Sequence, residues 1–165
     1  MKISLITSTF NSASTVRDTL ESVKTQTYPD VEYIVIDGGS SDDTLKVLAD
    51  YEDLIDLLVS EPDDGIYDAL NKGIKLSTGD VVGFIHSDDL LTSSSVLSDI
   101  AHCFENEATD AIYADLDYVD RTNPDKIVRK WRSKPFDRAN FHKGWMPAHP
   151  TFYLRRKHYM EFGLY

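Results

Sequence analysis

Short apolar runs alternate with amphipathic stretches along the first 104 residues of the chain. Four runs predict buried strands at residues 3–7, 31–36, 57–59 and 80–85. Between and after them, apolar residues recur at helical spacing, which predicts helices near residues 16–23, 45–48, 66–74 and 96–104. Crossovers of this length join parallel strands. The pattern therefore predicts an α/β fold with a mostly parallel central sheet flanked by helices.

The pattern becomes less regular after Asp110. Residues 111–113 and 127–129 have the composition of strands, but the segments that connect them show no clear period. Residues 135–150 predict a loop rich in aromatic side chains, and residues 151–154 predict a last strand. A last helix is expected over residues 156–162, ended by Gly163. Because no linker or repeat interrupts the chain, we expect residues 1–165 to form a single domain.

The charge balance limits the class of partner. The formal net charge is −11 and the sequence pI is about 4.7, which argues against non-specific binding to nucleic acid or to an anionic membrane. No apolar run approaches the roughly 20 residues that a transmembrane helix needs. Cys103 is the only cysteine, so no disulfide can form within the chain, and we expect this thiol to be buried in a helix. These features favour a reducing, cytoplasmic setting.

Polar side chains follow each predicted strand, where parallel α/β sheets bind their ligands. Thr9 and Asn11 follow the first strand, Asp37 ends the second, and the adjacent carboxylates Asp88 and Asp89 follow the fourth. Two neighbouring carboxylates repel each other and suit a hard cation such as Mg²⁺ or Mn²⁺, which can bridge them to the phosphates of a substrate. Gly38 lets the backbone approach a ligand or simply forms a turn, and both interpretations stay open.

Several familiar sites are missing from the sequence. The first strand lacks the G-x-G-x-x-G of dinucleotide-binding folds, and the chain has no phosphate-binding P-loop motif. It has no zinc-type Cys/His spacing and no G-x-S-x-G nucleophile turn. A phospho-accepting receiver domain would need acidic residues where Thr7, Ser8 and Thr9 stand. These absences leave the divalent cation and an anionic substrate as the best-supported chemistry.

Eight blocks of sequence occur in a characteristic order. They are Ile6–Asn11, Ser22–Pro29, Glu32–Thr44, Asp64–Ile74, Thr78–Asp80, Ser87–Asp89, Ala148–Phe152 and Phe162–Tyr165. Together they resemble bacterial family-two glycosyltransferases of the GT-A fold, a Rossmann-like sandwich. The resemblance covers nearly the whole chain. It implies that residues 1–110 bind a nucleoside-diphosphate sugar, with UDP-sugars favoured, and that residues 111–165 begin the acceptor side.

The resemblance also implies roles for individual residues. We expect Thr9, Asn11, Asp37, Gly38 and Asp88 to bind the nucleotide sugar. Asp89, together with Asp88, is expected to hold Mg²⁺ or Mn²⁺ on the diphosphate. Enzymes of this family usually invert the anomeric carbon, and a carboxylate base takes the proton of the acceptor hydroxyl.

The chain departs from the family pattern at two places. His86 stands where many relatives have an aspartate, and we expect it to be a hydrogen-bonded histidine at the end of the strand and not a metal ligand. The family's base lies in an acidic motif that would fall beyond Tyr165. Within the chain, Asp115, Asp117 and His149 are weaker candidates for this base.

The resemblance leaves the substrates and the exact activity open. The acceptor is expected to be a glycan or a lipid-linked molecule in cell-surface polysaccharide or glycan synthesis. The enzyme would then work in the cytoplasm, with peripheral association at the inner face of the membrane. The alternative is a non-catalytic domain that only binds a sugar nucleotide.

Overall fold

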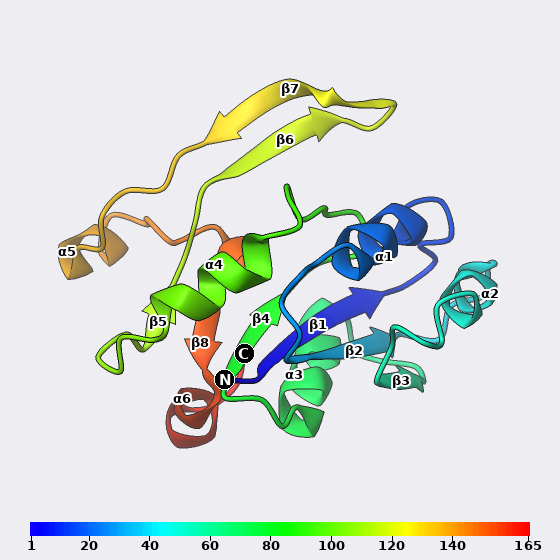
Figure 1. The fold of residues 1–165 in the computed structure, drawn as a ribbon, viewed down its shortest axis with the longest axis horizontal. Helices are drawn as coiled ribbons and strands as arrows, with labels where there is room; N and C mark the ends of the chain where they lie inside the picture. The colour runs from blue at the N-terminus through cyan, green and yellow to red at the C-terminus, as the bar shows by residue number, and fades with distance from the viewer.

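A computed structural model describes residues 1–165 and shows a central sheet with helices on both faces (Figure 1). The sheet has six strands in the order β3-β2-β1-β4-β8-β5. The strands are β1 (Ile3–Thr9), β2 (Val31–Asp37), β3 (Leu57–Ser60), β4 (Val81–Phe84), β5 (Ala111–Ile112) and β8 (Tyr153–Arg155). The first four run parallel, whereas β8 pairs antiparallel with both β4 and β5. The predicted class, a mostly parallel α/β sheet, is confirmed.

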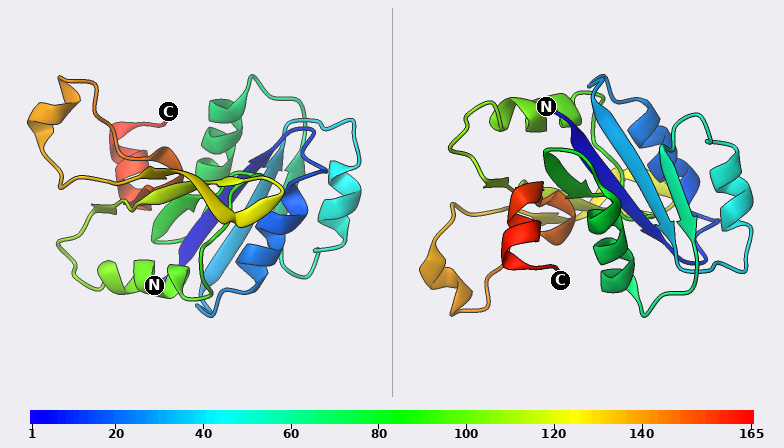
Figure 2. Two further views of the ribbon diagram at one scale, coloured as in Figure 1. Left: turned by 90° about the horizontal axis from the view of Figure 1, so that it is seen from above. Right: turned by 90° about the horizontal axis from the view of Figure 1, so that it is seen from below.

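The helices are α1 (Val16–Lys24), α2 (Thr44–Ala49), α3 (Ile66–Leu76), α4 (Val96–Cys103), α5 (Arg138–Phe141), α6 (Arg156–Phe162) and the 3₁₀ helix η1 (His149–Thr151). All except α5 and η1 form two layers on the faces of the sheet (Figure 2). Apolar side chains of α1, α2 and α4 pack on one face of the sheet, and those of α3 and α6 pack on the other. Burial on both faces explains why the central strands appear as continuous apolar runs in the sequence.

Neighbouring strand residues belong to different layers. In β1, Leu5 packs toward α1 and α4, while Ile6 packs toward α3, and both side chains are fully buried. The antiparallel strand β8 depends on Gly83 in β4. A Cβ atom at Gly83 would lie 2.0 Å from the ring of Tyr153, so only glycine leaves room for this ring. Tyr153 thereby brings β8, and η1 just before it, against the end of β4.

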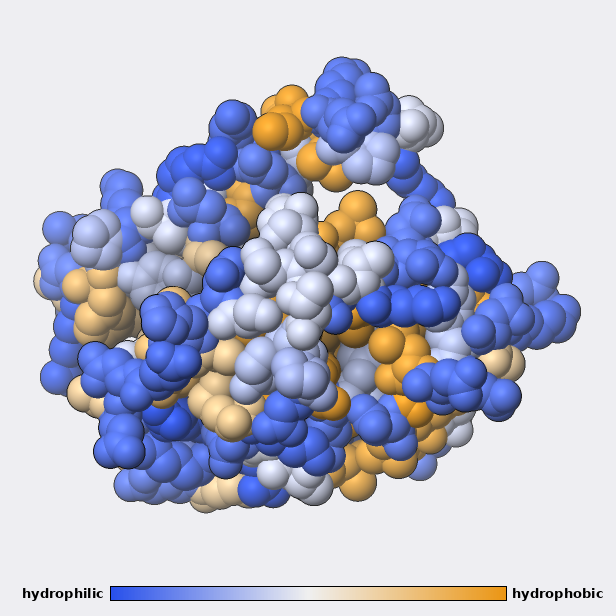
Figure 3. Space-filling view, in the orientation of Figure 1, coloured by the Kyte–Doolittle hydropathy of each residue, from blue (hydrophilic) through white to orange (hydrophobic).

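A hairpin projects from the rest of the fold. Strands β6 (Leu116–Asp120) and β7 (Asn123–Trp131) pair only with each other, in a separate two-stranded antiparallel sheet (Figure 1). Near the hairpin tip, the Arg121 guanidinium donates a hydrogen bond of 2.7 Å to the Ser14 hydroxyl. Figure 3 shows an opening between the hairpin and the body of the molecule, with apolar and charged residues side by side on the hairpin. Eight of the nine residues of β7 and two of the five residues of β6 are exposed.

Three details differ from the sequence-based expectations. The expected strand over residues 151–154 is shorter and shifted, because η1 occupies residues 149–151. Residues 135–150 contain the short helix α5 in addition to loop. Cys103 is exposed and not buried, because the inward stripe of α4 consists of Leu97, Ile100 and Ala101 and continues to Phe104. No helix has the combination of length and hydropathy needed to cross a bilayer.

Candidate active site

A cleft of about 590 Å³ opens at the carboxyl ends of β1 and β4. Its walls come from the loops after β1, β2, β3 and β4 and from the start of α3. The lining residues are Ser8, Thr9, Phe10, Ser12, Gly38, Asp63, Gly65, Ile66, Ala69, His86, Ser87, Asp88, Asp89 and Pro150. Three of the residues expected to bind the nucleotide sugar, namely Thr9, Gly38 and Asp88, therefore share this cleft with Asp89.

Asp37 lies beneath the cleft and not in it. Its side chain is fully buried, and its two carboxylate oxygens accept hydrogen bonds from the Thr9, Ser40 and Ser60 hydroxyls and from the amides of Gly39 and Ser40. Burial by itself would raise the pKa of Asp37, but the hydrogen bonds from Ser40, Ser60 and Thr9 lower it. The expected direct contact with a nucleotide base is not available in this arrangement. Asp37 instead fixes the loop that carries Gly38.

Asn11 has a similar supporting position. It adopts a left-handed backbone conformation with φ of 50°, which asparagine tolerates better than most residues. Its side-chain oxygen accepts hydrogen bonds of 2.9 Å from the amide of Ser41 and 3.3 Å from the amide of Asp42. Asn11 thus ties the loop after β1 to the loop after β2, and its side chain does not line the cleft.

Asp63 is a cleft residue that the sequence analysis missed. A Cβ atom at Gly38 would lie 2.7 Å from the Asp63 Oδ2 atom, so the Asp63 carboxylate occupies the space directly above Gly38. One of its oxygens, Oδ1, accepts a hydrogen bond of 2.9 Å from the amide of Gly65. Asp63 therefore places a carboxylate at the end of the cleft nearest β2, where Asp37 was expected to act. The signal in the sequence was a Pro-Asp-Asp-Gly turn, which indicates a loop but not its proximity to Gly38.

A buried threonine holds the acidic turn after β4. The amide of Asp89 donates a hydrogen bond of 3.0 Å to the carbonyl oxygen of His86, which closes the turn. The hydroxyl of Thr19, fully buried in α1, is 2.9 Å from the carbonyl oxygen of Asp89 and 3.3 Å from that of His86. The Ser12 and Ser87 hydroxyls, 2.8 Å apart, connect the turn to the loop after β1. These contacts fix the two carboxylates at the cleft wall.

The charge on Asp89 is poorly compensated within the protein. Burial, and then the neighbouring charge of Asp88, raise the pKa of Asp89 from 3.8 to about 6. No group of three or more acidic, histidine or cysteine side chains is arranged to enclose a metal ion. A divalent cation held by Asp88 and Asp89 would need further ligands from a substrate, as Mg²⁺ commonly takes from phosphates. The residues present fit such a cation.

The rings of His86 and His149 lie next to each other at the end of the cleft that is farther from β2. Their ring centroids are 5.1 Å apart, and His86 lines the cleft together with Pro150, the neighbour of His149. The Nδ1 atom of His86 and the Nε2 atom of His149 are inaccessible to solvent and have no hydrogen-bond partner. The hydrogen bond that was expected to hold the His86 side chain is therefore not found at Nδ1. Burial lowers the pKa of both imidazoles, in His149 aided by the proximity of His86.

Aromatic rings surround this histidine pair. The ring of His149 lies 5.6 Å from both Tyr165 and Phe84, and Tyr67 lies 5.8 Å from Tyr165. The side chain of Asn71 in α3 forms hydrogen bonds of 2.9 and 3.0 Å with the backbone carbonyl and amide of Tyr165. These contacts hold the end of the chain against α3 and complete an aromatic cluster beside the cleft.

The other two candidates for a catalytic base lie elsewhere. Asp115 and Asp117 stand at the base of the hairpin, where both pair with Arg132 at 3.5 and 2.7 Å. Asp115 also accepts a hydrogen bond of 2.8 Å from the amide of Ser133. Neither carboxylate lines the cleft. Their contacts support a structural role in holding the two strands of the hairpin together.

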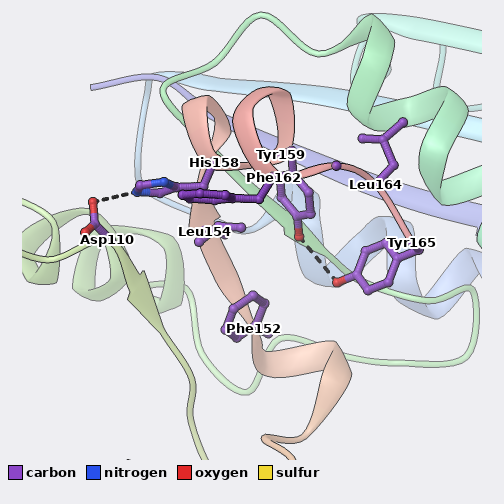
Figure 4. Close-up of a pocket in the computed structure, with 9 residues that line it drawn as sticks. Asp110, Phe152, Leu154, His158, Tyr159, Phe162, Leu164 and Tyr165 are labelled. Carbon is purple, nitrogen blue, oxygen red and sulfur yellow. Dashed lines mark hydrogen bonds and ion pairs between the residues drawn. The ribbon is translucent and has the colours of Figure 1, made fainter.

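A second cavity, of about 450 Å³, lies beside α6 and β8 (Figure 4). Most of its wall is apolar and includes Phe152, Leu154 and Phe162. In its wall, the Nε2 atom of His158 lies 2.7 Å from the Oδ1 atom of Asp110, and the dashed line in the figure marks this contact. The cavity has no cluster of free polar groups. The cleft at the ends of β1 and β4 is therefore the better candidate for an active site.

Comparison with known families identifies the chain. Residues 4–162 match the model of glycosyl transferase family 2, so the chain belongs to this family. Among its relatives, an uncharacterized glycosyltransferase of Mycobacterium tuberculosis is 41% identical over 97 residues, which is 58% of this chain and 37% of that protein. A PGL/p-HBAD biosynthesis glycosyltransferase of Mycobacterium bovis is 33% identical over 117 residues, covering 68% of this chain and 46% of the relative. The chain thus spans less than half the length of these relatives.

Solved structures share the fold. The crystal structure of S. aureus TarS 1-349 in complex with UDP-GlcNAc has a TM-score of 0.80 at 22% identity, covering 98% of this chain and 47% of that one. Mannosyltransferase PcManGT from Pyrobaculum calidifontis, in complex with GDP-Man and Mn²⁺, has a TM-score of 0.76 at 21% identity, covering 99% and 47%. These similarities show that the chain has the same fold as these transferases, as the sequence resemblance implied.

Proposed function

We propose that the protein containing this chain transfers a sugar from a nucleoside-diphosphate sugar to a hydroxyl group of an acceptor. The single observation that carries the proposal is the cleft, which has Gly38 and Asp63 at one end and the adjacent carboxylates Asp88 and Asp89 in its wall. Residues 1–110 would hold the donor, and residues 111–165 would begin the acceptor side. A non-catalytic binding domain is less favoured, because the matched relatives are transferases.

The order of the strands supports a placement of the parts of the donor along the cleft. In this proposal, the base lies at the Gly38 end of the cleft, beside the carboxylate of Asp63, which can accept a hydrogen bond from a base N–H. The ribose and diphosphate extend past Thr9 toward Asp88. Asp37 and Asn11 act indirectly by fixing the loops after β1 and β2.

Asp89 and Asp88 would hold Mg²⁺ or Mn²⁺. When bound, such a cation neutralises the charge that develops on the departing diphosphate. The reaction breaks the bond between the anomeric carbon and the diphosphate oxygen and forms a bond to the acceptor oxygen. Attack from the face opposite the leaving group inverts the anomeric carbon, and the acceptor proton passes to a carboxylate base. We assign this base to no residue of the chain, because Asp115 and Asp117 pair with Arg132 away from the cleft and the third candidate, His149, is not a carboxylate and does not line the cleft.

The distribution of charge supports an acceptor at an anionic membrane surface. Although the chain is acidic overall, residues 126–143 contain seven Lys or Arg residues and one Asp, and only Lys126 and Arg132 of the seven form ion pairs with carboxylates of the hairpin region. Exposed apolar side chains accompany them, including Ile127, Val128, Phe136 and Phe141. Cationic and apolar groups on one exposed segment are typical of interfacial binding. We therefore propose a lipid-linked glycan acceptor, reached from the cytoplasmic face of the membrane during cell-surface polysaccharide or glycan synthesis.

A thermal-shift screen tests the donor assignment. UDP, GDP, UDP-GlcNAc and GDP-Man are each added at high concentration, with and without Mn²⁺ or Mg²⁺. A ligand at 100 times its Kd stabilises the folded state by about 2.7 kcal/mol, which raises the Tm by roughly 5–10 °C for a domain of this size. We expect such a rise for at least one nucleotide only when the cation is present. Uridine and guanosine, which lack phosphates, are the matched controls; a screen in which no nucleotide changes the Tm contradicts the proposal.

A further inference from the structure

The end of the cleft away from β2 contains polar groups that the donor assignment above does not use. The sheet order is β2-β1-β4-β8. Gly38 follows β2, Asp88 and Asp89 follow β4, and η1, which contains His149, leads into β8. Adjacent strands are about 4.8 Å apart, so His149 lies beyond the acidic turn in the direction that leads away from the base, and it contacts His86 of that turn. In a nucleoside-diphosphate sugar, the group that follows the diphosphate is the sugar ring.

Each of the two imidazole rings has a buried nitrogen atom without a hydrogen-bond partner. His86 Nδ1 and His149 Nε2 are shut off from solvent and have no hydrogen bond, although buried polar atoms are nearly always paired. A neutral imidazole has one N–H donor and one acceptor nitrogen. A sugar hydroxyl can both donate and accept, so it matches such a pair. The torsion that turns an imidazole ring is soft, which lets a ring present its free nitrogen to the cleft.

The surroundings of the pair favour a sugar ring over a charged group. Phe84, Tyr67 and Tyr165 lie within 6.3 Å of the His149 ring centroid. Ile66 and Pro150, the chain neighbours of Tyr67 and His149, line the adjacent wall of the cleft. No Lys or Arg lines the cleft, so its wall offers no cationic side chain to a further phosphate. An apolar wall next to a few hydrogen-bonding groups suits a pyranose, which has apolar C–H groups as well as hydroxyls.

We propose that His86 and His149 form the subsite for the sugar ring of the donor and hydrogen-bond one of its hydroxyl groups. His86, which lines the cleft, contacts the sugar directly. His149 completes the pair from η1 and is itself held in place by Tyr165 and Phe84. This inference rests on the proposed function, because it takes the donor to be a nucleoside-diphosphate sugar. It adds the residues that distinguish the sugar from the nucleotide.

The test compares each nucleotide with its sugar derivative. The Kd values of UDP and UDP-GlcNAc, and of GDP and GDP-Man, are measured with Mn²⁺ by titration calorimetry. The proteins are the wild type, His86→Leu, His149→Leu, His86→Asn and His149→Gln. In His86→Asn the side-chain amide replaces the Nδ1 atom of the imidazole, and in His149→Gln it replaces the Nε2 atom. His102→Leu, a change at an exposed histidine of α4, is the matched control. Binding of the nucleotide alone reports whether each variant retains a folded cleft.

We expect the leucine variants to weaken binding of the sugar nucleotide about five- to tenfold while the Kd of the nucleotide alone changes less than twofold. The amide variants should recover most of the loss. If the nucleotide and its sugar derivative weaken equally, or if neither changes, the subsite is refuted while the proposed donor class stands. If the wild type binds neither nucleotide pair, the proposed function itself fails, and the subsite with it.

Discussion

Replacing Asp89 by asparagine should stabilise the free protein. The pKa of Asp89 rises from 3.8 to about 6 because the charged form is buried and lies next to Asp88. At 1.36 kcal/mol for each pKa unit, this gap sets an upper bound of about 3 kcal/mol on the cost of the charge. Because the side chain is partly exposed, we expect a gain of about 1–2 kcal/mol for Asp89→Asn at pH 8. This corresponds to a Tm increase of roughly 2–8 °C.

The pH dependence of this gain identifies its origin. The folded state binds the Asp89 proton more tightly than the unfolded chain, so wild-type stability falls as the pH rises from about 4 to about 6. Below pH 4 both states are protonated, and the difference between wild type and variant should disappear. Denaturant unfolding at pH 4, 6 and 8 measures it. Asp53→Asn, at an exposed carboxylate outside the cleft, is the control.

Ligand should reverse the order of stability. With Mn²⁺ and a nucleoside diphosphate present, the wild type gains stability and Asp89→Asn does not, because the variant lacks one cation ligand. An Asp89→Asn protein that is less stable than the wild type at pH 8 without ligand would refute the reasoning. The carboxylate would then be a structural group whose charge the protein already compensates.

Three further changes test other parts of the structure. Thr19→Val removes the hydroxyl that bonds the carbonyl oxygens of His86 and Asp89; we expect a loss of about 1–2 kcal/mol in the free energy of unfolding by urea, and weaker Mn²⁺-dependent nucleotide binding. Gly83→Ala should lower the Tm by several degrees, because its Cβ would overlap the Tyr153 ring and overpacking costs about 1–3 kcal/mol. Hydrogen bonds from Ser4, Thr78 and Lys2 overcome the effect of burial and lower the pKa of Glu32 to about 2. Glu32→Gln should therefore lower the free energy of unfolding by about 2 kcal/mol at pH 7. This loss should become progressively smaller as the pH falls from about 4.5 toward 2. An unchanged Tm for Gly83→Ala, or a Glu32→Gln cost that does not depend on pH, would contradict these contacts.

The sequence predicted the first half of the fold because its central strands, β1, β2 and β4, are buried on both faces. Continuous apolar runs and helical spacing reveal β1 to β4 and their helices without any knowledge of distant contacts. The hairpin was only partly predicted: eight of the nine residues of β7 are exposed, so no alternating pattern marks the strand. The antiparallel pairing of β8 was also hidden, since it depends on the space that Gly83 leaves for Tyr153, 70 residues away.

The site was predictable in its location but not in its contacts. The rule that ligands bind at the carboxyl ends of parallel strands correctly brought Thr9, Gly38, Asp88 and Asp89 to one cleft. It could not show that five hydrogen-bond donors occupy the Asp37 carboxylate, or that Asp63 reaches back over Gly38. The contact of His86 with His149 joins two segments that share no local sequence pattern. Such long-range side-chain contacts require the folded structure.

The central claim is that the cleft binds a nucleoside diphosphate through a divalent cation at Asp88 and Asp89. The most direct test is a crystal of the protein soaked with UDP or GDP and Mn²⁺, with the anomalous scattering of manganese used to locate the ion. The account predicts a single strong peak at bonding distance from a carboxylate oxygen of Asp89 or Asp88, with the diphosphate as a second ligand and the base near Gly38 and Asp63. A nucleotide bound in the apolar cavity beside α6, or a manganese ion that contacts neither aspartate, would contradict it.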